Sequence, residues 1–362
     1  MYRNTKNVPY YVFGRGSLAQ LGDLLKPRRE AVDGPVVYFV DHFFRDHELI
    51  GRLPMEKGDQ LHFVDSSSEP EVTRIDAFKE AVSAADSRTP CCVVGIGGGN
   101  ALDTAKAVAN LLTNPGKAED YQGWELVKNP AVYKIGIPTL SGTGSECSRT
   151  CVLTNIPKNL KLGMNSDYTV YDQLLLDPDL LATVPRDQYF YTGIDTFMHC
   201  VESLQGSYRN AIIDAFSVRA VQLCEEIFLS DDMMSRDVTP IPHNGWRPPP
   251  PRGARPAGNV GVIHPFSAGL GVVLHVAHGL GNCLALNVLG DIYPKEYKQF
   301  RTMIERQGVN LPTGICKDLT EEQYEGLYRG CIVHEKPLTN ALGPDFKQIL
   351  TRENLIERYK SI

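Results

Sequence analysis

The sequence predicts an α/β N-terminal half with a parallel sheet, followed by an all-α C-terminal half. In the first half, short apolar runs alternate with segments of helical spacing, which is typical of parallel strands joined by crossover helices. After about Pro185, strand signals become scarce and long amphipathic helical patterns follow. A chain of 362 residues is also longer than one ordinary core requires, so we expect two domains, residues 1–185 and 186–362.

The predicted elements follow one another in a regular order. Apolar runs indicate strands at 36–40, 60–64, 91–96 and 133–137, and helical spacing indicates helices at 71–85, 101–112, 191–204 and 211–229. The first strand ends at Asp41, the third runs into glycines, and the fourth ends at Thr139. Ligands of open α/β sheets bind at the carboxyl ends of the strands, so these three positions mark the expected binding edge.

Composition excludes several classes of protein. Hydrophobic residues make up 42% and charged residues 22%, which argues against disordered, collagen-like and coiled-coil architectures. The 37 basic and 43 acidic residues leave a net charge of −6, so we expect no nucleic-acid partner. Nine cysteines without a Cys-x-x-Cys pair favour a reducing compartment.

Targeting and membrane signals are weak. No apolar stretch follows the polar residues 1–7, so we expect no secretory signal and a cytoplasmic protein. Residues 257–290 carry no Asp, Glu, Lys or Arg, but they contain several glycines and three histidines. A lipid-facing helix tolerates such residues poorly, so we interpret this stretch as buried core around a polar site, with no membrane partner.

A proline-rich segment, residues 237–259, interrupts the helical half. It includes four consecutive prolines, Pro248 to Pro251, which cannot continue a helix and favour extended polyproline II. A surface loop or insert is the simpler interpretation. The alternative is a proline-rich ligand for a partner domain.

The glycine-rich turn after the third strand is a candidate phosphate site. Gly97, Gly98 and Gly99 precede a predicted helix, whose N-terminus offers free N–H groups and a positive dipole end to a pyrophosphate. We expect Asn100 to cap this helix, with Asp103 completing an arrangement like a capping box. The alternative is a tight turn without ligand, because the spacing is not Gly-x-Gly-x-x-Gly.

A second turn of small residues, 141–146, follows the fourth strand and is expected at the same edge of the sheet. Asp41 follows the first strand, where a carboxylate accepts hydrogen bonds from ribose hydroxyls and repels a 2′-phosphate. Its position therefore favours NAD over NADP, although a carboxylate that only caps a loop fits the spacing nearly as well.

A metal site is predicted in the helical half. Asp195 and His199 lie four residues apart on one face of a predicted helix. His264 and His278 would be ~21 Å apart on an unbroken helix, so we expect a break at Gly269 or Gly271 that folds His278 back. One carboxylate and three imidazoles suit Fe²⁺ or Zn²⁺.

Two alternatives to this site stay open. His275 competes with His278 for the fourth position. Each histidine, taken alone, is more often a hydrogen-bonded core residue than a ligand.

Taken together, these motifs resemble the iron-containing (group III) alcohol dehydrogenase family over nearly the whole chain. The matching stretches are 11–18, 97–106, 138–146, 193–199, 264–269 and 278–282. The resemblance implies a Rossmann-like α/β domain and an all-α domain in a dehydroquinate synthase-like architecture. It also implies a homodimer or larger assembly that acts on a small-molecule alcohol or sugar.

The resemblance assigns roles to particular positions. Asp195, His199, His264 and His278 match the metal ligands, with Fe²⁺ implied and Zn²⁺ as the alternative. The positions that match the family's cofactor turns, with NAD implied and NADP as the alternative, are Asp41, Gly97, Gly98, Gly99, Asn100, Asp103, Thr139, Ser141 and Thr143. The implied reaction is hydride transfer from an alcohol polarised by the metal to the nicotinamide.

Within the family, the chain looks most like the 3-deoxy-manno-octulosonate (Kdo) 8-oxidase group. The stretches that match are 120–124, 148–150, 166–170, 200–204 and 315–319. Those enzymes oxidise the terminal primary alcohol of an acidic sugar. Arg149 is then a candidate partner for a substrate carboxylate, with an ordinary structural ion pair as the alternative.

The chain departs from the family at two places. Ala268 stands where many members carry a histidine sometimes assigned to proton relay, so the proton must leave through water, the cofactor ribose or His275. Residues 237–259 replace the helix that leads into the third ligand, which predicts weaker support for His264. Two other functions therefore stay open: a dehydroquinate synthase-like lyase that uses NAD and a metal, and an inactive relative with a damaged metal site.

Overall fold

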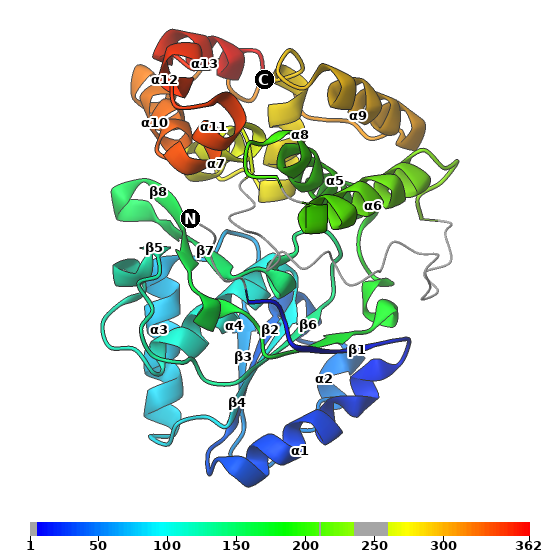
Figure 1. Cartoon of the computed structure of the whole chain (residues 1–362). Coiled ribbons are helices and arrows are strands. Elements are labelled where there is room, and N and C mark those ends of the chain that lie inside the picture. The colour runs from blue at the N-terminus through cyan, green and yellow to red at the C-terminus, as the bar shows by residue number, and fades with distance from the viewer. Residues whose placement is uncertain (1–5, 210, 235–259) are drawn as a thin grey trace.

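The computed structural model describes residues 6–209, 211–234 and 260–362, and Figure 1 shows a sheet half stacked against a helical half. The proline-rich segment 237–259 lies outside the described residues. The sheet has six parallel strands in the order β1-β9-β6-β4-β2-β3. Their bounds are β1 Tyr10–Phe13, β2 Val36–Asp41, β3 Gln60–Val64, β4 Cys92–Gly97, β6 Lys134–Pro138 and β9 Gln173–Leu176.

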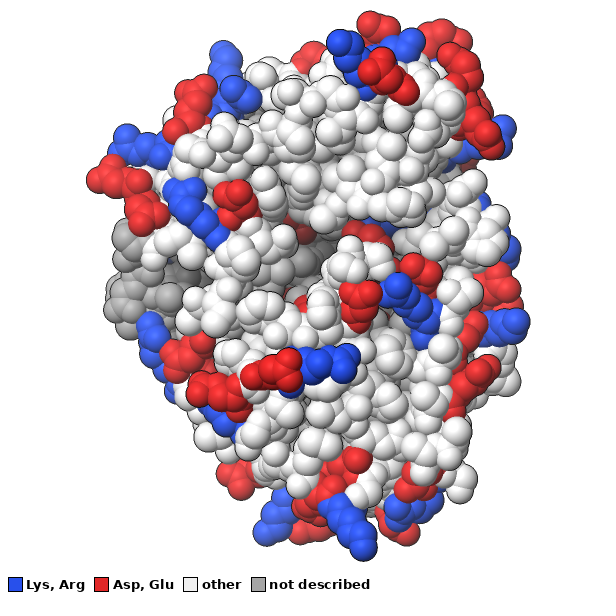
Figure 2. Space-filling model, turned by 180° about the vertical axis from the view of Figure 1, so that it is seen from behind, with Lys and Arg blue, Asp and Glu red and all other residues white. Residues whose placement is uncertain are grey.

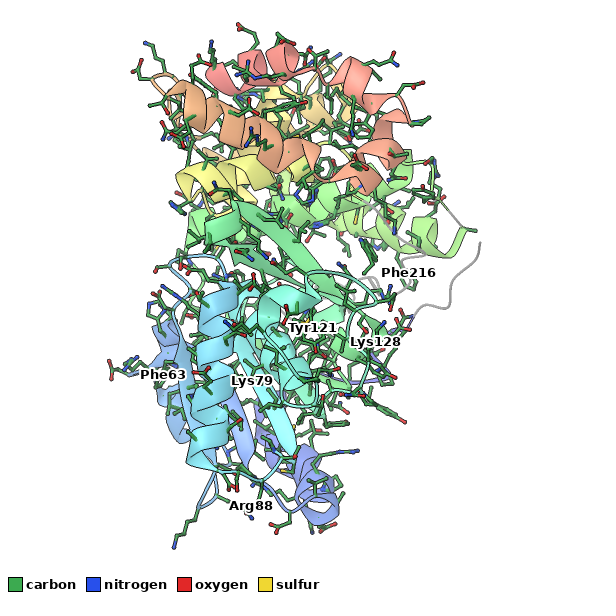
Figure 3. The ribbon with its side chains drawn as sticks, turned by 90° about the vertical axis from the view of Figure 1, so that its left-hand side faces the viewer. Phe63, Lys79, Arg88, Tyr121, Lys128 and Phe216 are labelled. Carbon is green, nitrogen blue, oxygen red and sulfur yellow. The ribbon has the colours of Figure 1, made fainter. Side chains whose placement is uncertain are left out.

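Helices cover the sheet half, and a smaller sheet projects from it toward the helical half. The helices are α1 Leu21–Ala31, α2 Glu48–Gly51, α3 Val72–Ala85 and α4 Gly99–Leu111. The second sheet has the order β5-β8-β7, with bounds β5 Gly123–Trp124, β7 Thr150–Asn155 and β8 Leu160–Asn165. Figure 3 shows α3, which carries Lys79, lying along the sheet half below the helical half.

The helical half begins with α5 and has its own apolar core. Its helices are α5 Arg186–Gln205, α6 Ala211–Phe228, α7 Ile263–Leu274, α8 His278–Val288, α9 Pro294–Gln307, α10 Glu321–Ile332, α11 Glu335–Leu342, α12 Phe346–Ile349 and α13 Arg352–Lys360. Within the described ranges, none of the helices is both long and apolar enough to cross a membrane.

The predicted fold class is confirmed. The four predicted strands are β2, β3, β4 and β6, and the four predicted helices are α3, α4, α5 and α6. Every residue of β4 is buried, as expected for a central strand that is covered on both faces. A Cβ at Gly95 would lie 2.8 Å from the Cβ of Ala105, so a glycine in β4 lets α4 pack closely on the sheet.

The sequence pattern did not reveal β1, β9 or the small sheet. β1 is only four residues long and exposes two tyrosines, so it shows no apolar pattern. β9 is buried, but its apolar run of three leucines is too short to indicate a strand. Their pairing is set by contact between distant parts of the chain, Tyr10 with Gln173 and Phe13 with Leu176.

Arg29 and Asp59 form an ion pair beside Val36, the first residue of β2. We expect Asp59→Ala to lower the free energy of unfolding by about 3 kcal/mol. Asp59 accepts two hydrogen bonds from Arg29, at 2.6 and 2.9 Å, and others from the backbone N–H groups of Val36 and Glu56. The Asp59 side chain is 2% exposed. Its loss would leave the exposed carboxylate of Glu56, at 3.2 Å, as the remaining ion-pair partner of Arg29, and would leave two backbone N–H groups without this acceptor.

The effect of Asp59 should also depend on pH. Burial raises the pKa of Asp59, but the hydrogen bonds from Arg29 and from the backbone outweigh it, and the pKa is lowered. The stabilisation is therefore present above the unfolded-state pKa near ~4 and is lost as the pH falls below it. Urea unfolding across this pH range measures both effects. The control is Asp33→Ala, because Asp33 is a partner of Arg88 whose side chain is 90% exposed. Equal losses for the two variants would contradict the prediction.

Candidate metal centre and cofactor turns

Helix α5 supplies the first two residues of the candidate metal centre. The helix presents Asp195 and His199 one turn apart, as their spacing predicts. The carboxylate of Asp195 is 1% exposed, and its Oδ1 lies 3.1 Å from Nδ1 of His199. The same Nδ1 lies 2.8 Å from the backbone carbonyl oxygen of Asp195, so both the main chain and the carboxylate orient this imidazole.

Helices α7 and α8 supply the other two residues. The expected break between them exists, but its predicted position is wrong, because Gly269 and Gly271 both lie inside α7. A Cβ at Gly269 would lie 2.7 Å from the carbonyl oxygen of Leu327, so this glycine permits close packing against α10. The chain instead turns at His275, which is exposed and left-handed with φ 54°, and α8 begins at His278.

The four predicted ligands converge. Asp195, His199, His264 and His278 each offer one donor atom, and these atoms all lie within 4.8 Å of one another. Oδ1 of Asp195 lies 3.3 Å from Nε2 of His264 and 3.7 Å from Nε2 of His278. His275 is not part of this group, so His278 fills the fourth position.

The arrangement fits a divalent cation. Within the described part of the chain, Oδ2 of Asp195 and Nδ1 of His278 are buried without a hydrogen-bond partner. A buried polar atom that lacks a partner costs free energy, and a cation held by this carboxylate would offset that cost. One carboxylate with three imidazoles is a donor set that Fe²⁺ and Zn²⁺ both accept.

Electrostatics keep two of the groups in their ligand forms. Burial raises the pKa of Asp195, but its electrostatic interactions and hydrogen bonds with the surrounding histidines outweigh burial and hold the pKa well below its ordinary value. Burial lowers the pKa of His278 to about 4. At neutral pH, therefore, Asp195 is a carboxylate and His278 is a neutral imidazole. Burial also opposes protonation of His264, but the carboxylate of Glu202 outweighs it and raises the pKa.

The predicted cofactor residues lie at one edge of the sheet. Asp41, Gly97 and Thr139 stand at the carboxyl ends of the adjacent strands β2, β4 and β6. The N–H of Thr139 donates to the carbonyl oxygen of Gly97 over 3.0 Å. Gly97 has φ +148°, and a Cβ there would lie 2.8 Å from the Cβ of Asp41, so only glycine fits between these strand ends.

The predicted capping of α4 is wrong. Gly98 is the N-cap, so no N-cap side chain accepts a hydrogen bond from the first turn of the helix. Asn100 lies inside the helix and donates to the carbonyl oxygens of Ser66 and Ser68. Asp103 is buried, accepts hydrogen bonds from the Ser145 hydroxyl and the Val152 N–H, and pairs with Lys106. It therefore connects α4 to the second turn instead of capping the helix.

The second turn connects the sheet edge to the metal centre. Thr143 lies against the first turn, since a Cβ at Gly99 would lie 3.3 Å from its Oγ1. The Gly142 carbonyl accepts a hydrogen bond of 2.9 Å from Thr196 of α5. Ser141 precedes Gly142 and is partly exposed. The turn and the metal-binding helix are thus in direct contact, and Figure 2 shows the surface hollowed between the two halves.

Arg149 already has two partners. Its guanidinium pairs with Asp167 at 2.9 Å and with Glu125 at 2.5 Å. The side chain is therefore part of an ion-pair network, which is the alternative that the sequence left open.

Three polar residues at the metal centre were not predicted from the sequence. Glu202 contacts Nδ1 of His264, and Asn282 donates to Oδ1 of Asp195 over 2.7 Å. Both lie one helical turn beyond a ligand, on the same face, so helical spacing could have indicated them. The third, Glu69, pairs with Lys161 at 3.1 Å and accepts from the backbone N–H of His278, a contact between distant segments that no local pattern indicates.

Comparison with known proteins agrees with this geometry. Residues 9–178 match the model of the family described as iron-containing alcohol dehydrogenase. The chain is 31% identical over 229 residues to sulfoacetaldehyde reductase of Bilophila wadsworthia, covering 60% of this chain and 56% of that protein. It is 27% identical over 278 residues to NAD-dependent methanol dehydrogenase of Bacillus methanolicus, covering 76% and 71% of the two chains. The chain thus spans little more than half the length of the first relative.

Two solved structures share the fold over almost their whole length. Alcohol dehydrogenase from Oenococcus oeni has a TM-score of 0.78 at 20% identity, with 99% of each chain covered. Sulfoacetaldehyde reductase from Bifidobacterium kashiwanohense, solved in complex with NAD+, has a TM-score of 0.74 at 22% identity, with 99% and 98% covered. The match over residues 9–178, together with the converged Asp195, His199, His264 and His278, shows that the chain is similar to the iron-containing alcohol dehydrogenase family.

Proposed function

We propose that this chain is a metal-dependent, NAD-linked dehydrogenase that interconverts a primary alcohol and its aldehyde. The observation that carries the proposal is the convergence of four donor atoms within 4.8 Å on helix faces that touch the second cofactor turn. A metal there would polarise the oxygen of a bound alcohol, and a nicotinamide in the adjoining hollow would accept the hydride.

The residues of the helical half would hold and orient the metal. Asp195, His199, His264 and His278 would bind Fe²⁺, with Zn²⁺ as the alternative, because a carboxylate and three imidazoles serve either ion. Asn282 donates to Oδ1 of Asp195 and so orients the carboxylate toward the imidazoles. These partners come from α5, α7 and α8, which pack into one apolar core.

The residues of the sheet edge would hold NAD. We infer that Gly97, Gly98, Gly99 and Asn100 receive the pyrophosphate at the start of α4, where the first-turn N–H groups point away from the helix. The side of the cofactor opposite α4 would be lined by Thr139, Ser141 and Thr143. Two relatives support this cofactor: the methanol dehydrogenase is described as NAD-dependent, and the Bifidobacterium enzyme was solved with NAD+.

Asp41 would select NAD over NADP. Its carboxylate accepts from the Phe43 N–H and the Ser66 hydroxyl, which hold it at the end of β2. We expect Asp41→Ala to reduce the preference for NAD about tenfold, or ~1.4 kcal/mol, because a charge that repels a 2′-phosphate is lost. Steady-state kcat/KM with both cofactors measures this, with the exposed Asp46→Ala as the control. An unchanged ratio would remove Asp41 from the cofactor site.

The finer proposal is a primary alcohol at the end of an acidic sugar, such as C8 of Kdo. It is supported by the sequence stretches shared with the Kdo 8-oxidase group, three of which meet in the small sheet. Trp124 ends β5, the Ser166 N–H donates to the Arg149 carbonyl, and Arg149 pairs with Asp167. Lys336 of α11 lies over the Trp124 ring at 3.7 Å, so these residues form part of the contact between the two halves.

Proton release would not use the position after the third ligand that many relatives use. Ala268 is buried in α7 one turn beyond His264 and has no titratable group. The proton would instead leave through water, the cofactor ribose or the exposed His275 at the end of α7.

The test is turnover by the full chain after loading with Fe²⁺ or Zn²⁺. We expect NADH to form with NAD and a primary alcohol, and Kdo to exceed short alkanols in kcat/KM. Release of phosphate from a phosphorylated sugar acid without net NADH would favour the dehydroquinate synthase-like lyase instead. A metal-loaded chain that turns over neither kind of substrate would support the inactive relative and overturn the proposal.

A further inference from the structure

Glu202 is a buried carboxylate that the four-ligand description leaves out. It lies on α5 one turn beyond His199, and it is 1% exposed. Among the described residues, no lysine or arginine forms an ion pair with this carboxylate. Its Oε1 accepts from the backbone N–H of Ile263 over 2.6 Å and from the hydroxyl of Tyr293 over 3.3 Å, and its Oε2 lies 2.5 Å from Nδ1 of His264.

These contacts determine which nitrogen of His264 faces the metal centre. A neutral imidazole has one N–H donor and one lone-pair acceptor. Because a carboxylate only accepts, Nδ1 must carry the proton, and Nε2 is left with the lone pair. Nε2 is also the nitrogen that lies 3.3 Å from Oδ1 of Asp195. The other tautomer would place two lone pairs against each other and would direct an N–H at the cation site.

We propose that Glu202 is a positioning residue that sets the tautomer and ring orientation of His264 for metal binding. It holds two consecutive residues at the start of α7, the N–H of Ile263 and the ring of His264, each with a different oxygen. The support of the third ligand therefore comes from α5, which also carries Asp195 and His199. A buried partner of a metal-binding histidine typically contributes about 10–100-fold to metal affinity.

The test compares a substitution of Glu202 itself with a substitution of Tyr293, which contacts the other carboxylate oxygen. In Glu202→Gln, the amide oxygen can accept from Ile263 and Tyr293, which turns the amide NH₂ toward His264 and favours the Nε2–H tautomer. We expect Co²⁺ and Zn²⁺ affinities, measured by competition titration, to fall about 10–100-fold, with an altered visible spectrum of bound Co²⁺. Tyr293→Phe removes the hydroxyl that donates to Oε1 and accepts from the N–H of Val262, but it leaves the contact between Oε2 and His264. Its Co²⁺ affinity and spectrum should therefore stay close to those of the unmodified chain.

Equal affinity and spectrum for Glu202→Gln and the unmodified chain would overturn the proposal, as would equal losses in the two variants. Histidine ¹⁵N NMR of the unmodified, zinc-loaded chain is a second test that does not depend on a variant's folding. With the His264 signal assigned by comparison with His264→Gln, an Nδ1–H is expected and an Nε2–H would refute it. The role of Glu202 rests on the proposed metal centre and not on the substrate. These metal-binding measurements would therefore test it even if the chain turned over no alcohol.

Discussion

Asp195→Asn is expected to abolish metal binding at micromolar concentrations and, with it, alcohol turnover. Asp195 is the only carboxylate in the group of four donors, and all three histidines lie around it. An amide keeps the shape but loses the charge that attracts the cation. Since the loss of an outer partner costs about 10–100-fold, the loss of this ligand should cost more.

Metal content and thermal unfolding measure this loss together. A ligand at 100 times its Kd stabilises the folded state by about 2.7 kcal/mol, so the unmodified chain should unfold at a higher temperature when metal is present. The Asp195→Asn variant should show no such shift. Asp187→Asn, an exposed position in the first turn of the same helix, is the control and should keep both the metal and the shift. A variant at Asp195 that retains one metal per chain would contradict the four-ligand site.

Gly142→Ala is expected to destabilise the chain by about 3 kcal/mol or more and to weaken NAD binding. Gly142 has φ +134°, and a Cβ there would lie 1.9 Å from the carbonyl oxygen of Thr192. The methyl group would separate the second cofactor turn from α5 and break the hydrogen bond from Thr196. Urea unfolding measures the first effect, and NADH fluorescence titration measures the second.

Gly14→Ala is the matched control for this variant. Gly14 has a similar backbone angle, φ +154°, but a Cβ there would meet no heavy atom within 4 Å. It therefore carries the conformational strain without the steric clash. If the two substitutions cost the same, backbone strain alone explains the loss, and the contact between the turn and α5 is not important for stability.

Much of the fold could be predicted because its strongest signals are local. The central strands β2 and β4 are buried on both faces, so their sequences are continuous apolar runs that need no tertiary information. The pairing of Asp195 with His199 could be predicted equally well, since residues four apart on a helix lie on the same face. The small sheet and the short strands β1 and β9 depend on pairing between distant segments, which no local pattern indicates.

At the metal centre, too, some features follow from the sequence and others depend on tertiary packing. The sequence pointed to Asp195, His199 and His264, and it left His278 and His275 as candidates for the fourth position. It also required a break between His264 and His278, because one unbroken helix cannot bring them together. The position of the turn, at His275 instead of Gly269 or Gly271, depends on how the helices pack. Both glycines lie inside α7, where Gly269 permits close contact with Leu327 of α10. The tertiary structure likewise decided that Glu202 of α5 supports His264, since a hydrogen bond between two helices depends on how they pack and not on either helical pattern.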